Sequence, residues 1–129
     1  MKVSFSAFGH PNITATHKTT LEITSDSEVS ASGTCIIGVR AKIPDLRCFL
    51  DKPSIIILLK VAGLEDKIRC VPNPSFQSDK ELVVRMGEFK SPRTFGLRAD
   101  KASRHIDRRI AQLLKDSSMR LQIEVTDEA

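Results

Sequence analysis

The sequence contains no tryptophan and no tyrosine, and its six aromatic residues are all phenylalanine. A core without the larger aromatic residues must be built mainly from isoleucine, leucine and valine, a mixture that favours strands. Long apolar runs are also missing, because the longest aliphatic segment, Ile55 to Leu59, is far shorter than the roughly 20 residues that cross a bilayer. No apolar leader follows Met1. The sequence therefore predicts a soluble, cytoplasmic protein without a membrane-spanning segment.

Cysteine is scarce, and no two of the three cysteines, Cys35, Cys48 and Cys70, have the Cys-x-x-Cys spacing. An odd number without that spacing argues against a disulfide framework and against a zinc ribbon. The sequence also lacks a glycine-rich phosphate loop, a Gly-x-Ser-x-Gly elbow and a His-Glu-x-x-His motif. It therefore predicts no metal site, indicates no particular cofactor and leaves enzymatic activity open.

The composition that is present suits one domain over residues 1–129, since 40% of residues are hydrophobic and 28% are charged. The net charge of +4 is unevenly distributed. Residues 85–109 contain eight lysines or arginines and three aspartates or glutamates. This basic region indicates an anionic partner.

Hydrophobic periodicity predicts about eight strands and two helices. The expected strands cover residues 3–7, 13–24, 34–40, 54–61, 67–71, 81–86, 94–99 and 120–126. The expected helices cover residues 44–50 and 103–115, the second with Ser103 as its N-cap. In the long strand 13–24, alternation places His17 on the apolar face and Glu22 on the polar face.

Two halves of the chain share a plan. Pro11-Asn12 matches Pro72-Asn73, and Gly38-Val-Arg-Ala41 matches Gly96-Leu-Arg-Ala99. Each half reads strand, strand, strand, helix, strand, which predicts pseudo-repeats of about 1–63 and 64–129. The expected fold is α+β, with mostly antiparallel or mixed strands in a curved sheet or barrel covered by two helices. The alternative is a chance match of two short strings.

Four residues are candidates for chemistry, namely His10, His17, Glu22 and Cys35. A thiol and an imidazole on neighbouring strands would suit a nucleophile and its base. Metal binding is disfavoured, since His17 and Glu22 are expected on opposite faces of one strand. The alternative is that His17 is a hydrogen-bonded core histidine, His10 a turn residue and Cys35 an inert buried thiol.

Five residues at the two expected strand-to-helix junctions are candidates for ligand binding, namely Arg40, Lys42, Arg98, Asp100 and Lys101. A helix N-terminus beside cations suits a phosphate or carboxylate. The leading hypothesis is therefore the binding or processing of an anionic, phosphorylated small molecule. The alternatives are solvated cations that bind nothing, or a nucleic-acid-binding module that uses the basic region 85–109.

Several short segments spread over nearly the whole chain have a recognisable pattern. They are Gly9-His-Pro-Asn-Ile-Thr-Ala15, His17, Thr20-Leu-Glu-Ile-Thr24, Cys35-Ile-Ile-Gly-Val39, Arg93-Thr94, Asp100-Lys-Ala102 and Asp107-Arg108. In these segments the sequence resembles the archaeal domain-of-unknown-function family 371. The resemblance implies an uncharacterised archaeal, cytosolic protein and implies no activity. The sequence departs from the family pattern at Cys70-Val-Pro72, where the family looks more like a second Gly-His-Pro.

The sequence leaves open whether the protein forms a homodimer.

Overall fold

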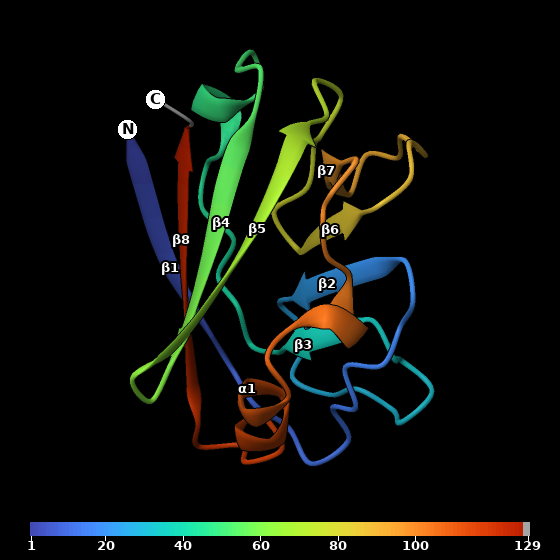
Figure 1. The fold of residues 1–129 in the computed structure, drawn as a ribbon, viewed down its shortest axis with the longest axis vertical. Coiled ribbons are helices and arrows are strands. Elements are labelled where there is room, and N and C mark those ends of the chain that lie inside the picture. Colours follow the sequence, from blue (N-terminus) through green and yellow to red (C-terminus); the bar gives the residue numbers. More distant parts are fainter. Residues whose placement is uncertain (128–129) are drawn as a thin grey trace.

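The computed structural model describes residues 1–127 and consists mainly of one mixed sheet of eight strands (Figure 1). The strands are β1 (Lys2–Phe8), β2 (Thr20–Thr24), β3 (Ile36–Gly38), β4 (Ile55–Val61), β5 (Leu64–Pro72), β6 (Glu81–Arg85), β7 (Thr94–Leu97) and β8 (Arg120–Asp127). The helical segments are two 3-10 turns, η1 (Arg47–Phe49) and η2 (Ser103–His105), and the α-helix α1 (Arg108–Leu113).

The sheet has the strand order β1-β8-β4-β5-β7-β6-β2-β3. Its two edge strands come together at an isolated antiparallel bridge, in which Phe8 and Val39 exchange two hydrogen bonds of 2.8 Å. Figure 1 shows the long strands β1, β8, β4 and β5 side by side, with the four shorter strands on the other side of the molecule. The sheet therefore curls until its edges meet, and the core lies inside the curl.

Alternating burial along the long strands gives this core its aliphatic lining. In β4, every second residue from Ile55 to Val61 is buried, and the residues between them are partly exposed. In β8, Leu121, Ile123 and Val125 are fully buried. A period of two with one buried face is what a sheet with one solvated face requires.

The predicted α+β class with two helices is wrong, because the structure is richer in strands. Residues 44–50 contain only the 3-10 turn η1, and residues 103–115 contain η2 followed by a six-residue helix. Ile106 interrupts the second segment with an extended backbone (ψ 154°), and α1 begins after Asp107, whose carboxylate accepts a bond from the Arg109 N–H. Ser103, the predicted N-cap, instead donates to the Cys35 carbonyl at 2.6 Å. Within residues 1–127 no helix has the length and apolarity needed to span a membrane.

The predicted long strand 13–24 is also shorter than expected, since only Thr20–Thr24 is a strand. Ala15 has a left-handed backbone (φ 51°), which a strand excludes. The His17 ring accepts bonds from the N–H groups of Thr19 and Thr20 at 3.2 and 3.0 Å. The alternating pattern of residues 13–19 therefore belongs to an irregular loop, and the argument that placed His17 and Glu22 on opposite faces of one strand fails.

Corresponding strands of the two halves pair in corresponding ways. The parallel pairs β2-β3 and β6-β7 have the same register, with the same interruption after the first residue pair. Between them, β2 and β6 pair antiparallel, with Glu22 opposite Val83 at the centre. Arg40 and Arg98, which follow β3 and β7, have nearly equal left-handed φ values of 55° and 51°. These features are consistent with the predicted pseudo-repeats.

Candidate functional site

The residues predicted to act in chemistry or binding fall into four places. They are the pair Glu22 and Cys35 on and beside β2 and β3, the loop of His10 and His17, the segment of Arg40 and Lys42 after β3, and the segment of Arg98, Asp100 and Lys101 after β7. The structure thus brings Glu22 next to Cys35 and separates the two cationic segments onto different grooves. Each place has its own charge balance, and that balance decides which of them suits a ligand.

The groove beside Arg40 and Lys42 has a volume of about 480 Å³. Its lining residues are Ser4, Phe5, Ser6, Phe8, Arg40, Lys42, Ile43, Pro44 and Arg120. Three of these are cations, two bear hydroxyl groups and none is acidic. We call this site the β1 groove. A lining that combines apolar side chains with a few positive groups is the usual form of a site for a small organic anion.

Arg40 is held in place before any ligand arrives. Its guanidinium lies 4.5 Å from the centre of the Phe8 ring, and its Nη2 donates to the Ser117 carbonyl at 2.5 Å. A cation stacked on a ring and bonded to backbone loses little further freedom on binding an anion. Lys42 is exposed and has no carboxylate partner within residues 1–127. The sequence pointed to Arg40 and Lys42, but it gave no signal for Phe8 or Arg120, which lie opposite each other on β1 and β8.

The cations of the second junction already have partners. Arg98 donates to Glu88 through Nε at 2.6 Å and Nη2 at 2.5 Å, and Lys101 bonds to Asp66. Asp100 accepts a bond from the Arg69 N–H at 3.0 Å. The groove beside Arg98 is lined by three cations and by two acidic residues. This junction is therefore close to electrically balanced, in contrast to the β1 groove.

Glu22 and Cys35 form a small polar cluster with Arg93 and Glu81 on the outer face of the sheet. The Cys35 thiol donates to Glu22 Oε1 at 3.7 Å, and Arg93 Nη1 lies 3.4 Å from that oxygen and 2.5 Å from Glu81 Oε2. Burial raises the pKa of Glu22 above its ordinary 4.5, and the Arg93 charge offsets this only in part. Burial, followed by the Glu22 carboxylate, raises the pKa of the Cys35 thiol to about 11. Cys35 is thus a neutral thiol at neutral pH and is not an activated nucleophile.

A Glu22→Gln variant is expected to be more stable than the parent protein above pH 5. Because the pKa of Glu22 is raised on folding, the stability that it contributes is complete below about 4.5 and falls as pH rises through the folded-state value. The glutamine does not ionise, so the variant escapes that loss. Urea unfolding of both proteins between pH 4 and pH 8 measures the difference, which should shrink toward zero at the acidic end. A difference that grows toward acid pH would contradict the role of burial.

The three histidines share one arrangement. Nδ1 of His10, His17 and His105 accepts a backbone N–H, from Asn12 at 3.0 Å, from Thr20 at 3.0 Å and from Ala102 at 2.9 Å respectively. An accepting Nδ1 leaves the proton of the neutral ring on Nε2. In His10 this N–H faces the Glu28 carboxylate at 3.0 Å. With Nδ1 accepting a bond and Nε2 carrying the proton, none of the three rings offers a free lone pair to a metal in this arrangement.

His17 and Cys35 lie close along the backbone without pairing through their side chains. The N–H groups of Thr16 and His17 donate to the Thr34 carbonyl at 3.0 and 3.2 Å. The Cys35 thiol instead faces Glu22. The structure therefore joins the backbones of the two neighbouring segments, but in the described part of the chain the two side chains do not form the proposed pair of nucleophile and base.

Comparison with known proteins tests the family resemblance found in the sequence. A family model described as a domain of unknown function (DUF371) matches residues 5–128. Among curated proteins, the uncharacterized protein MJ0206 of the archaeon Methanocaldococcus jannaschii is 34% identical over 125 residues, which cover 90% of this chain and 93% of the relative. The resemblance identified in the sequence is confirmed by both matches.

Proposed function

This chain belongs to the family described as a domain of unknown function (DUF371), and from its geometry we propose that it binds an anionic small molecule in the β1 groove. The observation behind this proposal is the charge of the lining, in which Arg40, Lys42 and Arg120 are present and no acidic residue is. Phosphate and carboxylate groups are the chemistry that such a lining recognises. A phosphorylated metabolite fits the predicted class.

The apolar part of the groove adds a second requirement for the ligand. Phe5, Phe8, Ile43 and Pro44 line it together with the cations. A bare inorganic anion would leave this surface uncovered, whereas a ligand with a ring or a carbon skeleton beside its phosphate would cover it. Of the two hydroxyl groups in the lining, that of Ser6 already donates to Gln122 at 2.9 Å, so we place the polar part of the ligand at Ser4 and the cations. We therefore favour an organic phosphate or carboxylate over inorganic phosphate.

We also propose that the halves 1–63 and 64–129 arose by duplication of one unit. The matched registers of the parallel strand pairs and the matched φ of Arg40 and Arg98 support it. On this proposal the grooves beside Arg40 and Arg98 descend from one site. Glu88, which pairs with Arg98 at 2.5 Å, would then mark the copy in which the anion has been replaced by a carboxylate of the chain.

A thermal-shift screen with single ligands tests the proposal. Sugar phosphates, nucleotides and di- or tricarboxylates are added to the protein, with inorganic phosphate as the comparison. A ligand at 100 times its dissociation constant adds about 2.7 kcal/mol of stability, and at roughly 4 °C per kcal/mol this raises Tm by about 10 °C. Lys42→Ala should weaken that ligand about tenfold, since it removes one charge-assisted bond.

Arg98→Ala is the matched control, because it removes a cation after the equivalent strand outside the β1 groove. It should leave the shift unchanged. Loss of the shift in Arg98→Ala with retention in Lys42→Ala would move the site to the second junction, where Arg98, Asp100 and Lys101 stay predicted contacts. No shift with any organic anion would overturn the proposal.

A cytosolic location and a homodimer also stay predictions. Light scattering of the purified protein measures its mass in solution and so tests the homodimer.

A further inference from the structure

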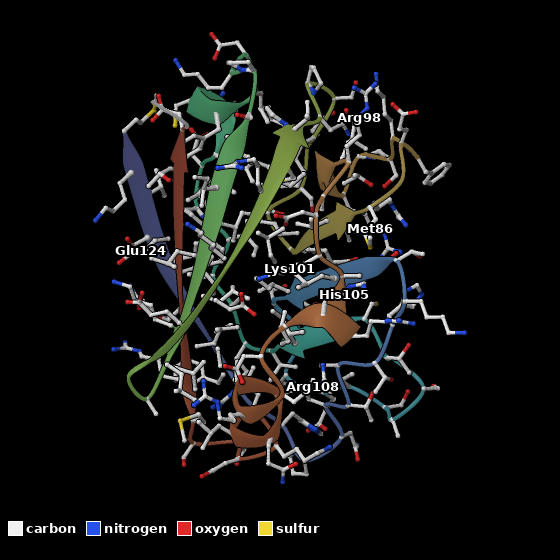
Figure 2. The ribbon with its side chains drawn as sticks, in the orientation of Figure 1. Met86, Arg98, Lys101, His105, Arg108 and Glu124 are labelled. Atoms are coloured by element: carbon white, nitrogen blue, oxygen red, sulfur yellow. The ribbon has the colours of Figure 1, made fainter. Side chains whose placement is uncertain are left out.

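The loop that joins β6 and β7 exposes an aromatic ring that the core does not use. Phe89 is 67% exposed, and Met86 at the start of the same loop is 36% exposed. Apart from Met1 at the chain start, these are the exposed large hydrophobic residues within the described residues. Exposed apolar side chains that gather on one loop indicate a contact surface. Figure 2 labels Met86 beside β6.

An arginine is stacked on this ring and is held there. The guanidinium of Arg85 lies 5.1 Å from the centre of the Phe89 ring. Its Nε donates to Thr94 Oγ1 at 3.0 Å, and that hydroxyl is 2.7 Å from Ser91 Oγ. Because Arg85 is in β6 and Thr94 in β7, the two strands position the cation against the ring. The pair joins a positive charge to an aromatic face, and we call Arg85 with Phe89 the platform.

Two exposed lysines belong to the platform loop and to the turn bonded to it, and the acidic residue before Phe89 in the chain is paired. Lys18 and Lys90 are exposed, and neither has a carboxylate partner within residues 1–127. The turn that contains Lys18 adjoins this loop, since the Met86 N–H donates to the Thr19 carbonyl at 2.9 Å. Glu88 is taken by Arg98 at 2.5 Å. The surface therefore offers an aromatic face within a positive field.

We propose that this platform binds single-stranded nucleic acid, with a base stacked on Phe89 and neighbouring phosphates bound by Lys18 and Lys90. Every base has a π-face, so stacking of this kind tolerates sequence, and arginine beside the ring adds cation–π attraction. Double-stranded nucleic acid does not present an unstacked base to one ring. A membrane surface is less suited, because Arg85 is bonded across the strands and is not free to reach headgroups. This surface is separate from the β1 groove, so the inference goes beyond the proposed small-molecule binding.

Fluorescence anisotropy with a labelled oligo(dT) or oligo(U) of roughly 12 nucleotides tests the proposal at low salt, about 50 mM. Phe89→Ala should weaken binding by about tenfold, whereas Phe89→Tyr should keep it. Lys90→Ala should weaken binding and lower the salt dependence. Lys67→Ala is the matched control, since it removes one exposed lysine from β5, away from the platform and the β1 groove, and it should leave the affinity unchanged.

Several results would overturn the proposal. Equal affinity for a duplex of the same length would show that the binding depends on charge and not on stacking of a base. Equal affinity of Phe89→Ala and the parent protein would show the same. The absence of any anisotropy change at low salt would show that the protein does not bind the oligonucleotide. Sedimentation with phosphatidylserine vesicles but no binding to the oligonucleotide would assign the loop to a membrane surface instead. The exposed ring can be removed without a cavity, and circular dichroism of each variant checks that the fold is intact.

Discussion

A Gly9→Ala variant is expected to lose about 3 kcal/mol of unfolding free energy, near the upper end of what overpacking costs. A Cβ at position 9 would lie 2.2 Å from the Asp116 carbonyl oxygen and 2.5 Å from that of Leu114. Both are backbone atoms, so no side-chain rotation can relieve the clash. The chain must move apart at a place where the Gly9 N–H donates to Met119 and the His10 N–H donates to Leu114, each at 2.9 Å.

The matched control for this variant is Gly87→Ala in the loop after β6. An added Cβ there meets no atom within 4 Å, and Gly87 does not have a positive φ. The same substitution should therefore change stability by no more than about 0.5 kcal/mol. Urea unfolding followed by far-UV circular dichroism measures both variants. Equal stability of Gly9→Ala and Gly87→Ala would show that the close approach of residues 9 and 116 is not needed by the fold.

Local patterns in the sequence located most strands but not the secondary structure between them. Alternation over Ile55 to Val61 and over Leu121 to Val125 reflects burial of one sheet face, and both segments are strands. Alternation over Ile13 to Thr19 has a different cause. There the left-handed backbone of Ala15 and the bond from the Thr20 N–H to the His17 ring belong to an irregular loop. No local rule separates the two cases, because the difference lies in bonds to distant residues.

The error in the helices has a similar origin. The stripe of Ile106, Ile110 and Leu114 is present and buried, so the periodicity was a true signal of a buried face. Yet Ile106 is extended, and the turn before it is bonded to distant residues, with Ser103 donating to the Cys35 carbonyl 68 positions away in the chain. A long-range hydrogen bond thus overrides a helical pattern that the sequence alone supports.

For the candidate site, too, the sequence located the residues from a local pattern but did not show their distant partners. The repeated Gly-x-Arg-Ala string drew attention to Arg40 and Arg98, which both have left-handed backbones in the structure. What distinguishes the two arginines is their partners, Phe8 and Ser117 for the first and Glu88 for the second. These partners come from other elements, so the charge balance of each groove was not readable from the sequence.

An Arg108→Ala variant is expected to lose about 2 kcal/mol of unfolding free energy, since hydrogen bonds donated by a charged group are among the stronger ones. Arg108 Nη1 donates to the Ser103 and Arg104 carbonyls at 3.1 and 3.0 Å. Its Nη2 donates to the Thr14 and Ala15 carbonyls at 3.3 and 2.9 Å. One guanidinium thus joins the irregular loop before β2 to the turn η2, and truncation leaves both without this donor.

The adjacent Arg109 provides the control, because the same substitution there removes a purely local contact. Arg109 Nη2 pairs with Asp107 at 2.7 Å, two residues away and at the surface. An exposed pair of this kind contributes little to stability. Limited proteolysis should therefore cut residues 13–19 faster in Arg108→Ala and at the parental rate in Arg109→Ala. Equal protection of this loop in the two variants would mean that Lys115, which donates to the Ile13 carbonyl at 2.8 Å, holds the loop without help from Arg108.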